Sequence, residues 1–351
     1  MHDPMDIRDL DYFPARCKAG SFTAVARNAH IVRSAGCTAA QAAAASVSCS
    51  LSGADRSEDL SQLPAGAGKW RRVIGGGKLH LQAGSCPSVA VMSARPFEIV
   101  CEIEPPVRPD LTHARHQIGV LTAVSSTFLI PDNHIGRATV SSIAVAHEVQ
   151  AMGGRSIACI NSRDRNLLGF RRDLLTAAAY GVGEFLFVYG DKPSSGGRTS
   201  DLTVRSMIEE ARSCTAADPA FAGVPAWRIG VAAALRPLPR WKHAADFIFS
   251  QVSYSADAQL RWRDANPADV PVYAGVMVLA SAAMARRLAA TIPDIEIPGW
   301  LTDKVARDKM AGVEAAYQQI ARLRDSGAFD GVHLIPVNRY REVSARLETL
   351  T

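Results

Sequence analysis

The chain has 351 residues, of which 48% are hydrophobic and 21% are charged, and its formal net charge is +5 at pH 7. This composition excludes wholesale disorder and a fibrous repeat, and no uncharged apolar run reaches the roughly 18 residues that a membrane span needs. The length fits two domains or one large α/β barrel, and the mild positive charge requires neither a nucleic acid nor a membrane as partner.

Cysteine usage and the N-terminus indicate the cellular setting. The seven cysteines form no CxxC pair and have no His-rich companion motif, so we expect neither a zinc site nor a disulfide framework. The opening MHDPMDIRDLDYF carries acids where a signal peptide needs basic residues. We therefore expect a cytoplasmic protein, without a bound metal.

Residues 1–91 differ in composition and in residue pattern from the rest of the chain. Residues 1–34 resemble the opening of LysR-type transcriptional regulators, but Pro14 falls inside the expected first helix and no recognition helix follows. From Ser34 to Val91 the chain is rich in Ala, Ser and Gly, without sustained apolar periodicity. We expect a helix-turn-helix-like remnant followed by a low-complexity linker, together a poorly ordered extension that does not bind DNA.

Residues 92–351 show apolar, β-branched runs that alternate with amphipathic helical stretches, the pattern of repeated βα units. Predicted helices cover residues 141–153, 167–181, 202–213, 256–265, 281–291 and 304–327, and several end at glycine, as helix C-termini often do. Eight such units in 260 residues match the usual size of about 250 for a (β/α)8 TIM barrel, so we expect an α/β catalytic domain over residues 92–351. The predicted strands are residues 97–104, 119–129, 156–161, 184–190, 227–235, 245–251, 270–277 and 331–337.

In this fold the chemistry lies at the C-terminal ends of the strands. The polar residues predicted there are Glu102, Glu104, Asp132, Asn133, Arg163 to Asn166, Asp191, Gln251, Tyr254 and Asn338.

Several of these strand ends carry a family resemblance. EIEPP at residues 102–106, YGDKP at 189–193 and SQ at 250–251 stand in the order and spacing of methylenetetrahydrofolate reductases. SRDRNLLGF, IPGW and the closing VHLIPVNR agree as well. The chain thus resembles this family over about residues 97–345.

The resemblance implies an oxidoreductase of one-carbon metabolism and methionine biosynthesis. It would reduce 5,10-methylenetetrahydrofolate to 5-methyltetrahydrofolate, or run the reverse reaction, with NAD(P)H as donor and bound FAD as carrier. Glu102 matches the family's general acid, while Asp191 and Gln251 match residues that bind the folate. Glu104 is either a second acid or a charge on the rim.

The expected flavin contacts depart from the family pattern. The family's long connection after strand five is reduced here to about a dozen residues, in which only Arg240 or Lys242 could replace a lysine that contacts FAD. Asn161 stands where the family often has threonine, so the cofactor-binding residues that we predict are Asn161, Asp191 and Arg240. Whether FAD is bound at all depends on these contacts.

Two other functions stay open. One is a flavin-less, folate-dependent enzyme that handles a methyl group, and the other is a non-enzymatic folate-binding or regulatory relic. The expected partners are a folate and a nicotinamide, with no membrane and no nucleic acid, and a homo-oligomer is left open.

Overall fold

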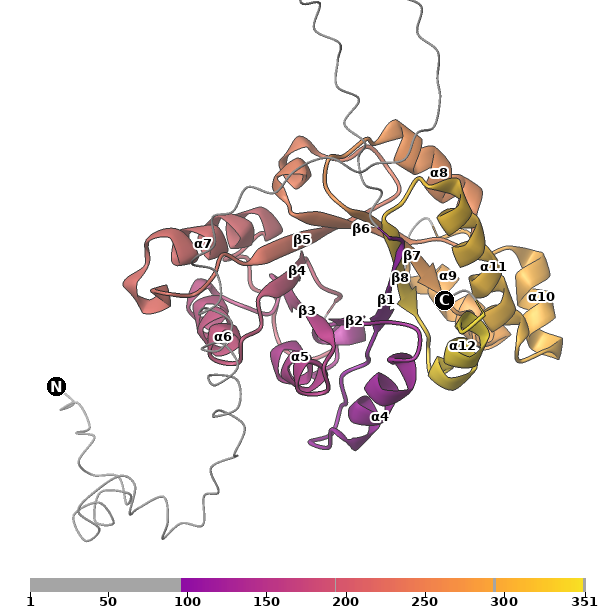
Figure 1. Ribbon diagram of the computed structural model, residues 1–351, viewed down its shortest axis with the longest axis horizontal. Coiled ribbons are helices and arrows are strands. Elements are labelled where there is room, and N and C mark those ends of the chain that lie inside the picture. The colour runs from indigo at the N-terminus through magenta and orange to yellow at the C-terminus, as the bar shows by residue number, and fades with distance from the viewer. Residues whose placement is uncertain (1–95, 193, 293–294, 350–351) are drawn as a thin grey trace, which may run out of the picture. The chain divides into compact units, whose positions relative to one another are not determined.

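A computed structural model describes residues 96–192, 194–292 and 295–349. Their strands close into a barrel in the order β1 to β8, with every neighbouring pair parallel, including β1 with β8. Helices surround the strands (Figure 1). The (β/α)8 barrel expected from the sequence is confirmed, whereas the predicted extension at residues 1–91 lies outside the described residues.

The eight strands are short and run mostly through buried positions. Their bounds are β1 Glu98–Glu102, β2 Thr127–Ile130, β3 Arg155–Asn161, β4 Glu184–Val188, β5 Arg228–Ala233, β6 Phe247–Val252, β7 Val272–Met277 and β8 Gly331–Ile335.

The α-helices follow the strands along the chain, with short 3-10 turns between some of them. The α-helices are α4 Thr112–Leu121, α5 Ser142–Ala151, α6 Leu167–Ala179, α7 Val204–Ala217, α8 Ala256–Ala265, α9 Ala282–Thr291, α10 Gly299–Arg307, α11 Ala311–Ser326 and α12 Tyr340–Leu347. The 3-10 turns are η2 His134–Gly136, η3 Pro219–Phe221 and η4 Arg240–Ala244.

Helix termini carry the local signals that start and end helices. The side chains of Asn166, Ser255 and Ser281 each accept a hydrogen bond from a backbone N–H in the first turn of the helix that follows. Gly153, Gly181 and Gly327 adopt positive φ after α5, α6 and α11, where a side chain would be strained. The glycine stops predicted from the sequence are therefore confirmed.

Two predicted boundaries are wrong. Residues 119–121 belong to α4 rather than to the second strand, because Ala114, Ile118 and Leu121 share one buried face at helical spacing. The long helix predicted over residues 304–327 is two helices, α10 and α11. The break comes at Asp308, whose backbone is extended and whose carboxylate accepts the Met310 N–H.

Apolar side chains fill two layers. One lies between the strands and the surrounding helices, and the other fills the barrel itself. The ring of Phe247 occupies the space beside Gly230, where a Cβ would lie 2.0 Å from a ring carbon. The barrel interior is lined by Val100, Leu129, Ile157, Cys159, Leu186, Phe247, Phe249 and Tyr273.

A polar network spans the barrel interior at its N-terminal end. The Glu98 carboxylate accepts hydrogen bonds from Arg155 Nη2 at 2.5 Å and Tyr273 Oη at 2.7 Å. Arg155 and Arg228 also pair with Glu184. Burial would raise the pKa of Glu98, but the hydrogen bonds it accepts, from Thr127 first, and the charge of Arg155 lower it overall.

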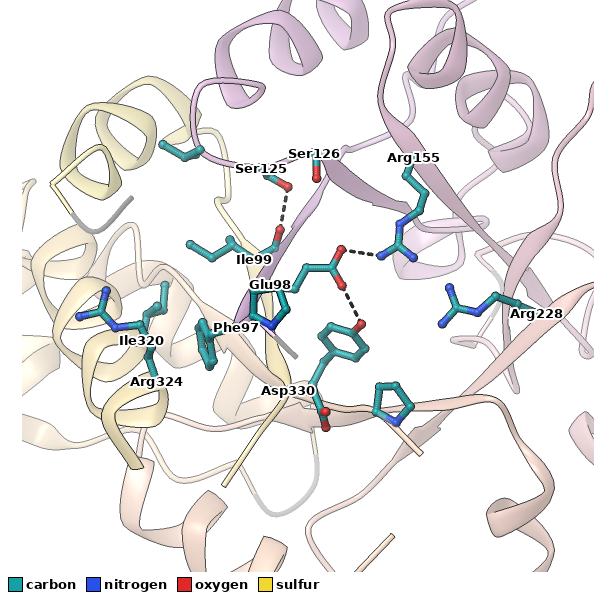
Figure 2. A pocket seen from close by; sticks show the side chains of 14 residues that line it. Phe97, Glu98, Ile99, Ser125, Ser126, Arg155, Arg228, Ile320, Arg324 and Asp330 are labelled. Carbon is teal, nitrogen blue, oxygen red and sulfur yellow. Dashed lines mark hydrogen bonds and ion pairs between the residues drawn. The ribbon is translucent and has the colours of Figure 1, made fainter. Parts of the chain in front are cut away.

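A cavity of about 810 Å³ opens at this end, lined by Phe97, Glu98, Arg155, Arg228 and others (Figure 2). Arg155, Arg228 and Glu98 are paired with one another or with Glu184, so their charges are already compensated. The cavity lies at the N-terminal ends of the strands, where this fold places stability rather than chemistry. Within the described residues, no helix is both long and apolar enough to cross a membrane.

Candidate active site at the C-terminal mouth of the barrel

Glu102 ends β1 with its side chain toward the barrel interior. The residue is 9% exposed. The polar group that approaches its carboxyl is His333 of β8, whose Nε2 lies 3.2 Å from Glu102 Oε2. Nε2 is buried and has no hydrogen-bond partner among the described residues, so this approach has the distance but not the angle of a hydrogen bond.

His333 is not among the residues predicted from the sequence. It stands in the middle of the apolar strand GVHLI, and its ring packs against that of Phe249 with centroids 5.3 Å apart. A lone polar residue at an inward position of an apolar strand is the signal that points to it. The sequence-based search considered only the ends of the strands and therefore missed this position in the middle of β8.

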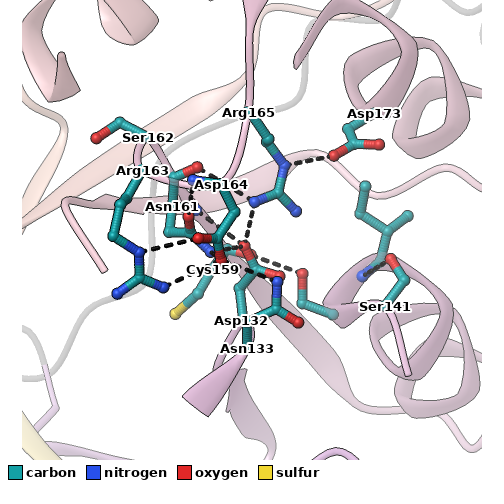
Figure 3. Close-up of polar contacts among 12 residues, drawn as sticks. Asp132, Asn133, Ser141, Cys159, Asn161, Ser162, Arg163, Asp164, Arg165 and Asp173 are labelled. Atoms are coloured by element: carbon teal, nitrogen blue, oxygen red, sulfur yellow. Dashed lines mark hydrogen bonds and ion pairs between the residues drawn. The ribbon is translucent and has the colours of Figure 1, made fainter. Parts of the chain in front are cut away.

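Asn161 ends β3 and is fully buried at the base of the loops (Figure 3). Its Nδ2 donates to Asp132 Oδ2 at 2.7 Å, and its Oδ1 accepts the Asp164 N–H at 2.9 Å. Both ends of the amide are thus occupied in bracing the loops after β2 and β3. Its contact with a cofactor stays a prediction, and such a contact would have to share these bonds.

The charged run after β3 forms ion pairs. Arg165 bonds Asp132 at 2.5 Å and Asp173 at 2.6 Å. Burial would lower the pKa of the Arg165 guanidinium, but the two carboxylates raise it overall. Arg163, which is 1% exposed, makes two hydrogen bonds to Asp164. The pairing lowers the pKa of Asp164 against the opposing effect of burial. The run is thus held by ion pairs, within its own loop between Arg163 and Asp164 and across to the loop after β2 between Arg165 and Asp132.

Asp191 follows β4 and is exposed at the mouth. Its Oδ2 accepts the Ile135 N–H from the loop after β2, at 3.0 Å. Gly190 directs the chain into this position with φ +94°, and a Cβ there would lie 2.9 Å from Asn161 Cβ. Ile135 itself has φ +57° and is 64% exposed, an unusual conformation for a β-branched residue.

Gln251 lies in a β-bulge. Phe249 pairs with Tyr273 and Val252 with Gly275, so the register between β6 and β7 shifts by one residue at this point. Gly275 is required there, because a Cβ would lie 2.6 Å from the Ser250 carbonyl oxygen. Bulges redirect side chains beside active sites, and this one leaves Gln251 exposed at the mouth.

The connection between β5 and β6 spans residues 234–246 and includes η4. Lys242 Nζ donates to the Ala232 carbonyl oxygen at 2.5 Å, and burial lowers the pKa of its ammonium group. Arg240 is exposed and Ala234 offers no aromatic surface. These residues do not fit the expected FAD contacts: one candidate cation, Lys242, is engaged by the barrel's own backbone, and no aromatic side chain stands at position 234.

The rim therefore holds Glu102, Asp191 and Gln251 at the ends of β1, β4 and β6, the same end of the barrel. No hydrogen bond joins the three side chains within the described part of the chain. Glu104 is exposed on the segment after β1, and Tyr254 and Asn338 lie on the same rim. Across the described ranges, no cluster of His, Cys, Asp and Glu side chains could hold a metal ion.

The fold and this rim define a TIM-barrel protein with a buried carboxyl at its mouth. The chain belongs to the methylenetetrahydrofolate reductase family, whose model matches residues 116–351. The matched segment includes Asp191, Gln251 and His333, whereas β1 and Glu102 precede it. The role of Glu102 therefore depends on the EIEPP motif and on its position in the barrel.

Solved structures share the barrel. An uncharacterized protein from Clostridium thermocellum that binds two copies of 5-methyl-5,6,7,8-tetrahydrofolic acid is similar at a TM-score of 0.51 and 13% identity, over 73% of this chain and 96% of that one. EDTA monooxygenase from Chelativorans sp. BNC1 is similar at a TM-score of 0.47 and 10% identity, over 73% and 93%. At such identities the likeness concerns the fold alone. Among curated proteins, no sequence matches the chain.

Proposed function

We propose that this protein reduces 5,10-methylenetetrahydrofolate to 5-methyltetrahydrofolate with a hydride from NADH or NADPH. The observation that carries the proposal is the family match over residues 116–351, combined with a buried carboxyl, Glu102, at the mouth of the barrel. The C. thermocellum protein, which has the same fold, binds a methylated tetrahydrofolate and supports the same class of ligand.

Glu102 acts as the general acid. The carbon bridge of the substrate becomes reducible when one of its C–N bonds breaks, which leaves an iminium ion on the other nitrogen. The departing amine needs a proton in that step, and a positioned carboxyl group contributes about 10² to 10⁴ in rate in such roles. Glu102 suits this role because it is mostly removed from water yet faces the mouth.

Asp191 and Gln251 bind the pterin ring. A carboxylate accepts two hydrogen bonds from the donor edge of a pterin, and a glutamine amide offers both donors and an acceptor. Asp191 uses Oδ2 for the Ile135 N–H, which fixes the carboxylate while Oδ1 has no hydrogen-bond partner among the described residues. Gln251 is presented by its bulge on β6.

The hydride comes directly from the nicotinamide in this proposal. Because the residues after β5 do not fit FAD, we derive no step through a flavin. The nicotinamide nucleotide acts as a second substrate that binds at the same mouth, which Ala232, an exposed residue at an inward position of β5, helps to keep open. A cytoplasmic location stays a prediction, and whether the chain forms a homo-oligomer stays open.

The experiment measures nicotinamide oxidation by the purified full-length chain with 5,10-methylenetetrahydrofolate, and identifies the product by mass spectrometry. Glu102→Gln should lower kcat by about 10² or more while folate still binds. Glu104→Gln is the matched control, since this carboxylate is two residues away and exposed, and it should leave kcat within about twofold.

Three results would change the proposal. If folate binds but no nicotinamide is oxidised, the protein handles a folate-borne methyl group without redox chemistry. If neither ligand binds, the family membership reflects the fold and not this reaction. An unchanged rate in Glu102→Gln would move the acid to another residue.

A further inference from the structure

The Glu102 and His333 side chains form a pair in the barrel interior of which the preceding mechanism uses only one member. At the N-terminal end of the barrel, the inward charges of Glu98, Arg155, Glu184 and Arg228 satisfy one another. Nearer the mouth, His333 Nε2 is buried, lies 3.2 Å from Glu102 Oε2, and has no hydrogen-bond partner in the described part of the chain. A buried polar nitrogen without a partner is costly, which calls for an explanation.

The surroundings of His333 leave Glu102 as its partner. Phe249 packs against the ring, and the residues opposite it on the neighbouring strands are Val100 and Gly275, which carry no polar side chain. The other group near Glu102 is Cys159 of β3, whose pKa is raised well above its usual value by burial and then by the charges of Glu102 and Asp132. That thiol remains neutral, so it adds no charge to the pair.

We infer that His333 is a positioning residue: its Nε2–H donates a hydrogen bond to Glu102 Oε2 during turnover, leaving Oε1 to carry the proton to the folate. This inference rests on the proposed function. In the step, the Oε1–H bond breaks, an N–H bond forms on the departing amine, and the electrons of the broken C–N bond remain on that nitrogen. The resulting Glu102 carboxylate is stabilised by the imidazole donor.

The geometry explains why the contact is imperfect without substrate. Catalytic hydrogen bonds are often poorly aligned before substrate binds and tighten in the reacting complex. Glu102 is at the last position of β1, so its side chain can turn without disturbing the strand ladder, whereas His333 is fixed in the centre of β8 between two paired strands. His333, the donor, is therefore held in place, and the Glu102 side chain rotates to complete the hydrogen bond.

Two substitutions of His333 distinguish a donor from a space-filling ring. Glutamine places an amide N–H near the position of Nε2, whereas the shorter asparagine does not reach it. We expect His333→Asn to lower kcat about 10- to 100-fold, the range for one hydrogen bond to a charged group, with the KM for folate little changed. His333→Gln should recover most of that loss. His113→Asn, on the exposed side of α4, is the matched control.

A double-mutant cycle tests whether His333 acts through Glu102. In a Glu102→Gln background, replacing His333 should cause no further loss of kcat, because the charge it stabilises no longer forms. Additive losses, or equal losses in the asparagine and glutamine variants, would overturn the inference. Thermal unfolding of each variant identifies any loss caused by misfolding, and if the asparagine variant misfolds, the NMR measurement on the wild type and Glu102→Gln decides the inference.

A readout independent of activity separates this inference from the proposed function. Histidine ¹⁵N NMR of the full chain reports which ring nitrogen of His333 carries the proton. We expect the proton on Nε2 and a change in that resonance in Glu102→Gln. A proton on Nδ1 alone, or no response to Glu102→Gln, would refute the inference even if the wild type is a reductase. If the wild type is not a reductase, the proposed function fails and so does this role, whatever the NMR result.

Discussion

Replacing Gly190 by alanine tests how the mouth holds Asp191. Two costs follow from the structure. The backbone has φ +94°, which strains an L-residue by about 1 kcal/mol, and the new methyl group would lie 2.9 Å from Asn161 Cβ. Asn161 cannot move aside without losing its bonds to Asp132 and Asp164, so the clash adds about 1 to 3 kcal/mol. We expect a total destabilisation of about 2 to 4 kcal/mol, and weaker folate binding because Asp191 is displaced.

The same loop supplies matched controls. Gly196 has φ +78° and open space within 4 Å of the position that a methyl group would take, so alanine there should cost only the backbone strain, about 1 kcal/mol. Gly197 also has open space and no positive φ, so its alanine variant should be neutral or slightly stabilising. Urea unfolding followed by circular dichroism measures all three. A Gly190→Ala variant no less stable than Gly196→Ala would refute the steric argument.

Three further predictions follow from other regions. Ile135→Asn should raise the free energy of unfolding by up to about 1 kcal/mol, because asparagine tolerates positive φ and the exposed side chain contributes little burial; a destabilised variant would contradict this. The lowered pKa of Glu98 means that its contribution to stability is complete above the ordinary pKa of glutamate, near 4.3, and is lost as pH falls through the lower folded value. Glu98→Gln should therefore show a shallower loss of stability in acid, and an unchanged pH dependence would argue against the network. Purified protein should bind FAD weakly or not at all. The flavin absorbance band after purification and a titration with FAD measure this. Protein that is purified yellow, with one FAD per chain, would refute the prediction and indicate an ordinary flavoenzyme.

The barrel could be predicted from the sequence because its strands and helices differ in the spacing of their apolar residues, and because several helices end at glycine. The errors came where local pattern is ambiguous. Residues 119–121 are apolar enough for either a strand or the last turn of α4, and only packing of that helix decides between them. The break between α10 and α11 depends on a single Asp308 turn within a sequence of good helix formers.

The site was less accessible to sequence reasoning. Strand ends indicated Glu102, Asp191 and Gln251, whose contacts with ligands stay predictions. The approach of His333 to Glu102 joins the first and last strands and requires knowledge of how the barrel closes. The hydrogen bonds from Asn161 to Asp132 and Asp164, which lie on different loops, likewise depend on how the loops fold together. The positions of these residues along the chain do not show that contact.

The ion pairs at the N-terminal end of the barrel bear on how such a protein can change during evolution. Glu98, Arg155, Glu184 and Arg228 link β1, β3, β4 and β5 at the end opposite to the mouth. These ion pairs therefore involve no residue of the loops at the mouth. Because the segment between Ala233 and Phe247 contributes no residue to these ion pairs, its length can change during evolution without disturbing them.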